Sequence, residues 1–256
     1  MSAVAVPLLD EVLEAHGGAD RCRQARTVTS RVRTGGLLAR TRLPGNRLAD
    51  YRLTVEVDPP RASLADFPHQ GQRGIFEPGR VRIEDEGGRP VAERADPRSV
   101  FFGVSGLRRV LRWDALDTTY FAGYAMWNYL TMPQLLEHDD IEVSQGGDWE
   151  EGGERWRRLE ASFPERLDTH SRRQTFYFDA RGVLRRHDYV AEVVGRWARA
   201  AHYCDDHVQA GGLVFPTRRR VVPVGPGNRA LPAPTLVSLE LSELHVEPRP
   251  EPEPVA

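Results

Sequence analysis

One long apolar segment interrupts a chain that otherwise alternates apolar and polar residues. This segment, RWDALDTTYFAGYAMWNYLTMPQLLEHDD from Arg112 to Asp140, places aromatic and aliphatic residues at helical spacing on two faces. Asp114 is positioned to cap its N-terminus, and Pro133 to bend or end it. A helix that is apolar nearly all round must be enclosed or must line a cavity. We therefore expect a helix over residues 113–136 that the rest of the chain surrounds.

The rest of the chain has the pattern of antiparallel strands. Segments such as TVTSRVRTGGLLARTRL and DYRLTVEVDPP alternate apolar and polar residues between Gly and Pro breaks. We count about ten such segments, which is enough for a strongly curved or nearly closed sheet. The predicted fold class is mainly β (α+β): a large antiparallel curved sheet, or half-open β-barrel, wrapped around the apolar helix.

Two short helices are expected before the first strand. Leucine and valine recur at helical spacing over residues 8–13, Gly17 and Gly18 end this helix, and Ala19–Ala25 forms the second one. The length of 256 residues suits one large all-β unit. We predict a single domain over residues 1–246 and an extended, solvated tail rich in proline and glutamate over residues 247–256.

Charge and composition exclude several classes of function. The formal net charge of −2 gives no general attraction to nucleic acid. No segment approaches eighteen consecutive apolar residues, so no stable membrane insertion is expected. The N-terminus lacks the cationic start of a signal peptide, and two cysteines, Cys22 and Cys204, are too few for a disulfide framework. These features predict a cytoplasmic protein with reduced thiols.

The segment between Phe176 and Val222 carries an unusual number of ionisable residues among aliphatic ones. If two of its strands pair as a hairpin around Gly195, His187, Tyr189, Arg199 and Tyr203 share one surface, to which Arg218 of the following strand is added. Such a surface offers an imidazole, phenols and cations to a ligand. The alternative is a polar network that fixes the register of a large sheet, and the sequence gives the two interpretations equal support.

The segment HYCDDH, from His202 to His207, contains residue types that bind zinc. His202, Cys204 and Asp206 would share one face of a strand. Structural zinc sites use four closed ligands, however, so a buried thiol and a hydrogen-bonded histidine explain the segment better. No metal and no cofactor is predicted.

The chain resembles the LolA-like superfamily in several segments. AHGGADRCRQARTV follows the first short helix, and QTFYFDARGVLRRHDY forms late strands of the same style. YAMWNYLTMP, ARAAHYC and FPTRRRV are similar to segments of soluble bacterial proteins of this fold. The resemblance extends over roughly residues 7–246 and implies an unclosed β-barrel that accepts lipids or lipoprotein acyl chains. It implies no catalytic residue.

Two functions follow as hypotheses. The first is a cytoplasmic protein that binds a lipophilic small molecule, a lipid or a polyketide-like compound, between the concave sheet and the helix. The expected ligand-binding residues are Trp113, Tyr120, Tyr124, Trp127, Tyr177, His187, Tyr189, Arg199, Tyr203 and Arg218. The alternative is a cofactor-free cyclase, isomerase or pericyclase of secondary metabolism that uses the same cavity, with His187 or His202 as base and Tyr189 or Tyr203 as proton donor. An interaction module remains a third possibility if side chains fill the cavity.

Overall fold

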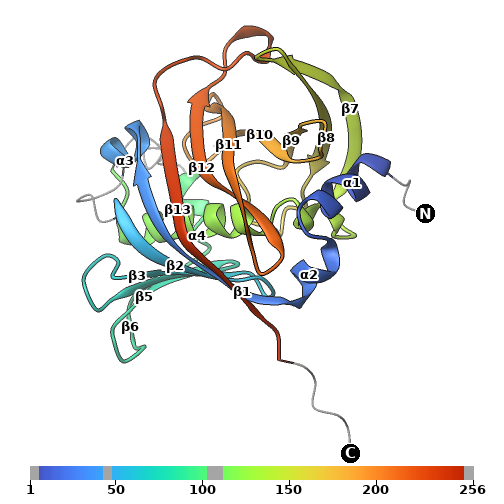
Figure 1. Ribbon diagram of the computed structural model, residues 1–256. Helices are drawn as coiled ribbons and strands as arrows, with labels where there is room; N and C mark the ends of the chain where they lie inside the picture. Colours follow the sequence, from blue (N-terminus) through green and yellow to red (C-terminus); the bar gives the residue numbers. More distant parts are fainter. Residues whose placement is uncertain (1–5, 43–47, 103–111, 251–256) are drawn as a thin grey trace, which may run out of the picture.

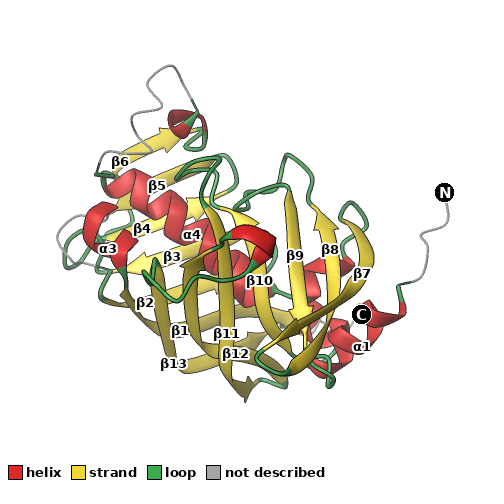
Figure 2. Cartoon of the chain, turned by 90° about the horizontal axis from the view of Figure 1, so that it is seen from above, coloured by secondary structure: helices red, strands yellow, loops and turns green. Residues whose placement is uncertain are grey.

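A single antiparallel sheet of thirteen strands dominates the computed structural model, which describes residues 6–42, 48–102 and 112–250. The strand order is β6-β5-β4-β3-β2-β1-β13-β12-β11-β10-β9-β8-β7, so β6 and β7 are the two edges and the sheet does not close. Figures 1 and 2 show this sheet curling around the helix α4. The predicted fold class is confirmed, with three more strands than the ten or so expected.

The first half of the sheet is a meander that ends beside α4. It consists of β1 (Ala25–Gly35), β2 (Asp50–Glu56), β3 (Arg61–Ala65), β4 (Arg73–Glu77), β5 (Arg80–Glu84) and β6 (Pro90–Ala95). The helices α1 (Pro7–Ala15) and α2 (Ala19–Gln24) precede it, α3 (Leu37–Arg42) follows β1, and the short helix η2 (Ser99–Phe101) follows β6. The two predicted N-terminal helices are thus present.

The second half of the sheet follows α4 along the chain. It consists of β7 (Glu142–Glu151), β8 (Glu154–Ser162), β9 (Arg173–Phe178), β10 (Leu184–Val190), β11 (Arg199–Ala210), β12 (Leu213–Pro223) and β13 (Val237–Pro248), with the short helix η5 (Pro226–Asn228) before β13. β13 pairs with β1 and joins the two halves. It contains the first two residues of the predicted tail, 247 and 248, and residues 251–256 of that tail lie outside the described part.

The central helix α4 spans Ala115–Thr131, and the short helix η4 (Gln134–Glu137) follows it. The predicted helix of residues 113–136 is therefore two helical segments separated at Pro133. Asp114 is the N-cap as expected: its side chain accepts a hydrogen bond from the Asp117 backbone N–H at 2.8 Å, and the Asp117 side chain accepts one from the Asp114 N–H at 3.2 Å. This capping box fixes where the helix begins.

One face of α4 packs closely on β2–β6 (Figure 2). At Gly123 the approach is so close that an added Cβ would lie 2.2 Å from the Cβ of Phe76. Phe76, Tyr120 and Tyr124 belong to one continuous hydrophobic cluster with the strands of this half. The space between α4 and the first half of the sheet is therefore filled by side chains.

Candidate functional site

The other side of α4 faces a polar interior built on β10, β11 and β12. His187 pairs with His202 across β10 and β11, and Cys204 pairs with Arg219 across β11 and β12. Tyr189 lies two residues beyond His187 on the same inward face. All five side chains are buried, with Tyr189 the most exposed at 7%. The strands thus place histidine, tyrosine and arginine where a sheet usually presents aliphatic residues.

His170 connects this inner face to α4. Its two ring nitrogens share hydrogen bonds with the hydroxyls of Tyr124 (3.2 Å) and Tyr129 (2.7 Å), and the Tyr129 hydroxyl also contacts that of Tyr189 at 3.2 Å. The rings of His170 and Tyr189 stack at 4.0 Å. His187 in turn shares a short hydrogen bond with the side chain of Gln174. A buried network of this kind fixes the register of the strands that contribute to it.

Burial keeps these histidines neutral. Loss of hydration and, secondly, the nearby Arg98 guanidinium together lower the pKa of His170 to about 3. The pKa values of His187 and His202 also lie well below the usual value, chiefly because of burial and secondly because of neighbouring histidines and Arg219. Burial raises the pKa of Tyr189 well above its ordinary value. At neutral pH the network therefore holds uncharged imidazoles and phenols.

Arg219 is the cation of this interior. It is 2% exposed, its Nη2 donates to the Tyr129 carbonyl at 2.9 Å, and its Nη1 lies 3.5 Å from the sulfur of Cys204. Its guanidinium also lies 4.9 Å from the centre of the Tyr129 ring, a cation–π contact. Sequence reasoning missed this residue, because it chose Arg218 from the run Arg218–Arg220.

The register corrects the predicted polar surface. His187 faces His202 rather than Tyr203, because the connection between β10 and β11 spans residues 191–198 and shifts the pairing by one residue from the expected hairpin. A shift of one residue moves every side chain of a strand to the other face. The interpretation that Arg199, Tyr203 and Arg218 join His187 and Tyr189 on one surface is therefore wrong. These three residues lie on the outer face, whereas His202 joins the inner one.

The outer face has its own buried cluster, centred on Arg186. Its guanidinium, which is fully buried, pairs with Asp188 and Glu151, each at 2.6 Å. The Tyr177 hydroxyl donates to Asp188 at 2.8 Å, and the Tyr203 hydroxyl donates to Glu151. These contacts fasten the end of β7 to the outer surface of β10 and β11. Tyr177 and Tyr203 therefore have partners in the protein itself.

The predicted ligand-binding aromatics on and before α4 divide into three that are packed in the core and one, Trp127, that borders a pocket. Trp113, Tyr120 and Tyr124 are no more than 2% exposed and lie in the core against the first half of the sheet. The Tyr120 hydroxyl donates to Asp168 at 2.6 Å. Trp127 is the member of this set that lines a pocket, although it is only 3% exposed.

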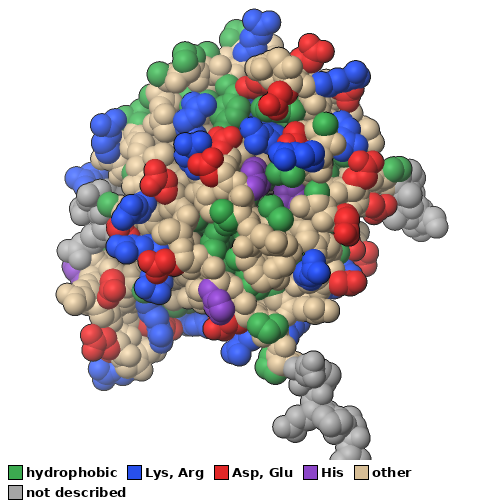
Figure 3. Space-filling model, viewed as in Figure 1, with side chains coloured by type: hydrophobic (Ala, Val, Ile, Leu, Met, Phe, Trp, Pro, Cys, Tyr) green, Lys and Arg blue, Asp and Glu red, His purple; other side chains and the backbone are tan. Residues whose placement is uncertain are grey.

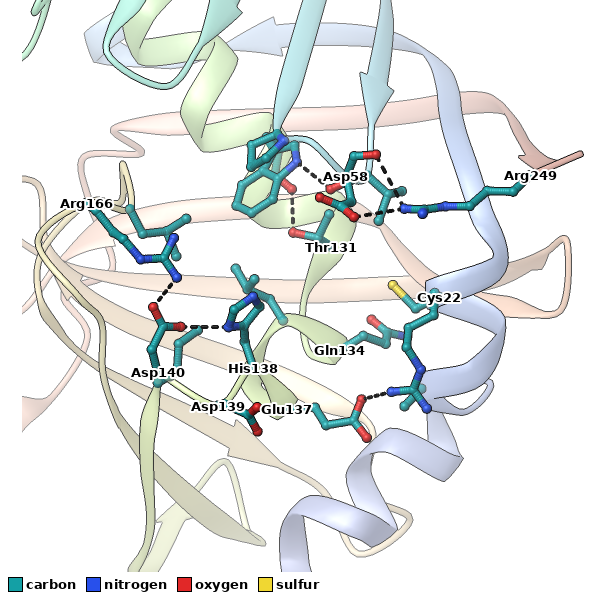
Figure 4. A pocket seen from close by; sticks show the side chains of 18 residues that line it. Cys22, Asp58, Thr131, Gln134, Glu137, His138, Asp139, Asp140, Arg166 and Arg249 are labelled. Atoms are coloured by element: carbon teal, nitrogen blue, oxygen red, sulfur yellow. Dashed lines mark hydrogen bonds and ion pairs between the residues drawn. The ribbon is translucent and has the colours of Figure 1, made fainter. Parts of the chain in front are cut away.

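This pocket, of about 670 Å³, opens at the C-terminal end of α4 (Figure 4). Its wall is formed by α2, the β2–β3 turn, α4, η4 and the loop after β8, and it contains the apolar side chains Val57, Pro60, Trp127, Leu135, Ile141 and Leu167. The indole N–H of Trp127 donates to the Glu56 carbonyl at 3.1 Å, which fixes the ring against the turn. Thr131 and Gln134 supply polar groups on the helix side.

Most charged residues at this pocket are paired with one another. Figure 4 shows Arg166 and His138 with Asp140, and Arg249 with Asp58. Glu137 pairs with Arg23 of α2. These pairs balance much of the charge around the opening without a ligand. Asp139, which also lines the pocket, has no ion pair among the described residues. Apart from Asp139, the unpaired surface of the pocket is largely apolar.

A second pocket, also of about 670 Å³, lies over the outer side of β8–β11. Of the predicted site residues, Tyr177, Tyr189 and Arg199 line it. Its other lining residues include Arg158, Glu160 and Arg173. This groove is polar and charged, in contrast to the pocket beside Trp127. The molecular surface of Figure 3 likewise mixes basic and acidic side chains over much of the visible face.

The possible metal ligands do not converge. His202 and Cys204 point inward, but Asp206 has a positive φ of 54° and is exposed, where it pairs with Arg218 at 3.2 Å. Within the described residues, no group of three or more His, Cys, Asp or Glu side chains is arranged to hold a metal ion.

Cys22 and Cys204 are free thiols that lie in separate hydrophobic clusters, as expected for reduced cysteines. None of the helices in the described part of the chain is long and apolar enough to cross a membrane. The cytoplasmic location stays a prediction.

Comparison with solved structures identifies the fold. The chain is similar to a LolA superfamily protein from Nitrosomonas europaea, with 14% identity, 96% of each chain covered and a TM-score of 0.51. It is also similar to a DUF1329 family protein from Desulfovibrio piger, with 12% identity, 94% of this chain and 92% of that chain covered, and a TM-score of 0.49. No family model and no curated protein matches the sequence. The expected LolA-like fold is therefore confirmed.

Proposed function

We propose that the chain binds a lipophilic small molecule in the pocket at the C-terminal end of α4. The observation that carries this proposal is the apolar wall formed by residues such as Trp127 and Leu167, beside charged groups of which all but Asp139 are already paired. A volume of about 670 Å³ lies within the range of small-molecule sites. The LolA-like resemblance supports it, because it implies a fold that accepts lipids or acyl chains.

The test introduces a charge into the apolar wall. Leu167 is partly buried and lines the pocket, so Leu167→Asp should weaken binding of an uncharged fluorescent lipid probe by at least tenfold while the fold persists. Leu38→Asp is the matched control, since Leu38 is also partly buried but lies on α3, away from the pocket. Native mass spectrometry of the purified chain would identify a compound that remains bound.

Equal loss of probe binding in the two variants, or none in either, would contradict this site. The enzymatic alternative stays a prediction without a supporting contact. His187, His202 and Tyr189 contact one another or α4, and none of them lines the pocket beside Trp127. Tyr203 lies on the outer face.

A further inference from the structure

Arg219 differs from the other fully buried arginine in having no acidic partner. Arg186 pairs with two carboxylates, whereas no Asp or Glu among the described residues lies within ion-pair distance of Arg219. Its Nε has no hydrogen-bond partner either. Burying a cation without a carboxylate partner is costly, and the carbonyl, the thiol and the Tyr129 ring that contact Arg219 carry no negative charge.

His202 lies beside Arg219 and also lacks a hydrogen-bond partner. His202 pairs with Val221 and Cys204 with Arg219, so the two side chains are diagonal neighbours on the inner face. Both ring nitrogens of His202 are buried and lack a hydrogen-bond partner. The neighbouring His187 and His170 each have a hydrogen-bond partner, Gln174 and Tyr129 respectively. A guanidinium and an imidazole with unused polar groups thus lie together, and no Asp or Glu of the described part of the chain pairs with either.

Arg219 contacts the helix α4, which also forms one wall of the pocket. Arg219 donates to the carbonyl of Tyr129, two residues before Thr131, which lines the pocket. Gln134, on the same side, donates to the His16 carbonyl at 3.0 Å. Thr131 and Gln134 line the pocket, whereas Arg219 and His202 do not.

We propose that the lipophilic ligand carries an acidic head group, which passes Thr131 and Gln134 to bind Arg219 and His202 while its apolar part stays in the pocket. This inference rests on the proposed function and names the class of its ligand. Arg219 presents donors in a fixed planar arrangement that suits a carboxylate or a phosphate. The anion supplies the charge that the interior lacks, and His202 supplies a further donor to it.

The test compares three probes with the same alkyl chain: myristate, myristyl phosphate and myristyl alcohol. We expect the full-length chain to bind at least one of the anions about tenfold or more tightly than the alcohol, as measured by displacement of an uncharged fluorescent lipid. The comparison of myristate with myristyl phosphate shows whether the site prefers a carboxylate or a phosphate head group. Arg219→Met should remove the preference for the anion and leave the affinity for the alcohol within about threefold.

His202→Phe should reduce the same preference by a smaller factor, because it removes one donor and keeps the ring volume. Arg52→Met is the matched control, since Arg52 is exposed and lies on β2. Equal affinity of the wild type for all three probes would overturn the acidic head group but keep the lipophilic site. Failure of all three probes to bind would overturn both proposals. If Arg219→Met still prefers the anionic probes, other residues bind the acidic head group and the proposed role of Arg219 is wrong.

Discussion

The two halves of the sheet bury different chemistry against the same helix. Toward β2–β6, α4 presents Tyr120 and Tyr124 to a cluster in which nearly every side chain is hydrophobic. Toward β10–β12, it presents Tyr129 to histidines and an arginine. The first half obtains its stability from packing. The second depends on each polar group finding a partner, so its stability should respond to pH and to single changes of charge.

Acid should therefore unfold the protein through its second half. Unfolded histidine takes up a proton near pH 6.5, but His170, His187 and His202 stay neutral in the folded state because burial lowers each pKa. The contribution of these neutral histidines to the unfolding free energy is complete above about pH 6.5 and falls as the pH decreases. For His170 it continues to fall until the pH reaches about 3. Below about pH 6.5, each fully buried histidine lowers the unfolding free energy by about 1.4 kcal/mol per pH unit. Several kcal/mol of unfolding free energy should therefore be lost by pH 5.

Urea unfolding measured between pH 8 and pH 5 tests this. His202→Leu should reduce the slope of unfolding free energy against pH, since its imidazole has no hydrogen bond to lose. His69→Gln is the control, because His69 is exposed in the turn before β4. A slope unchanged by His202→Leu would mean that this imidazole is protonated or hydrated in the folded protein.

Trp127→Ala should cause the second largest loss, about 3–5 kcal/mol of unfolding free energy. Trp127 borders the pocket but is 3% exposed and donates to the β2–β3 turn, so its ring acts as core. This loss should be the same at pH 8 and pH 6, because the ring contacts no titrating histidine of the second half. A loss below about 1 kcal/mol would show that the ring mainly lines an open space.

The difference between the halves also explains what the sequence could predict. The apolar helix and its cap were visible because Asp114 and the repeated aromatics are local signals. The inner polar face was not, because the pairing of His187 with His202 depends on how residues 191–198 connect two strands. One residue of register separates Arg219 from Arg218, and no local pattern distinguishes them. The pocket was missed for a similar reason, since α2, η4 and the β2–β3 turn meet there only after folding.

Tyr129→Phe should have an intermediate effect. It keeps the ring over which Arg219 lies but removes the hydroxyl that contacts His170 and Tyr189. Loss of a buried hydrogen-bond partner costs about 1–3 kcal/mol. The matched change is Tyr51→Phe in the first half, where Tyr51 is also buried but lies outside the histidine network. Thermal unfolding of the two variants should show the larger loss for Tyr129→Phe, and the reverse order would contradict the importance of the network.

The smallest effect is expected from Arg219→Met. Its comparison with Arg186→Met contrasts a buried arginine that has no acidic partner with one that has two. Replacing Arg219 leaves no carboxylate unpaired and removes the cost of burying its charge, so the unfolding free energy should change by less than about 1 kcal/mol or should rise. The control is Arg186→Met on the outer face, which strands Glu151 and Asp188 and should cost about 3–5 kcal/mol. Urea unfolding without added lipid measures both. Equal losses would mean that the Tyr129 carbonyl and ring stabilise Arg219 as well as two carboxylates stabilise Arg186, and the interior would then need no anion from a ligand.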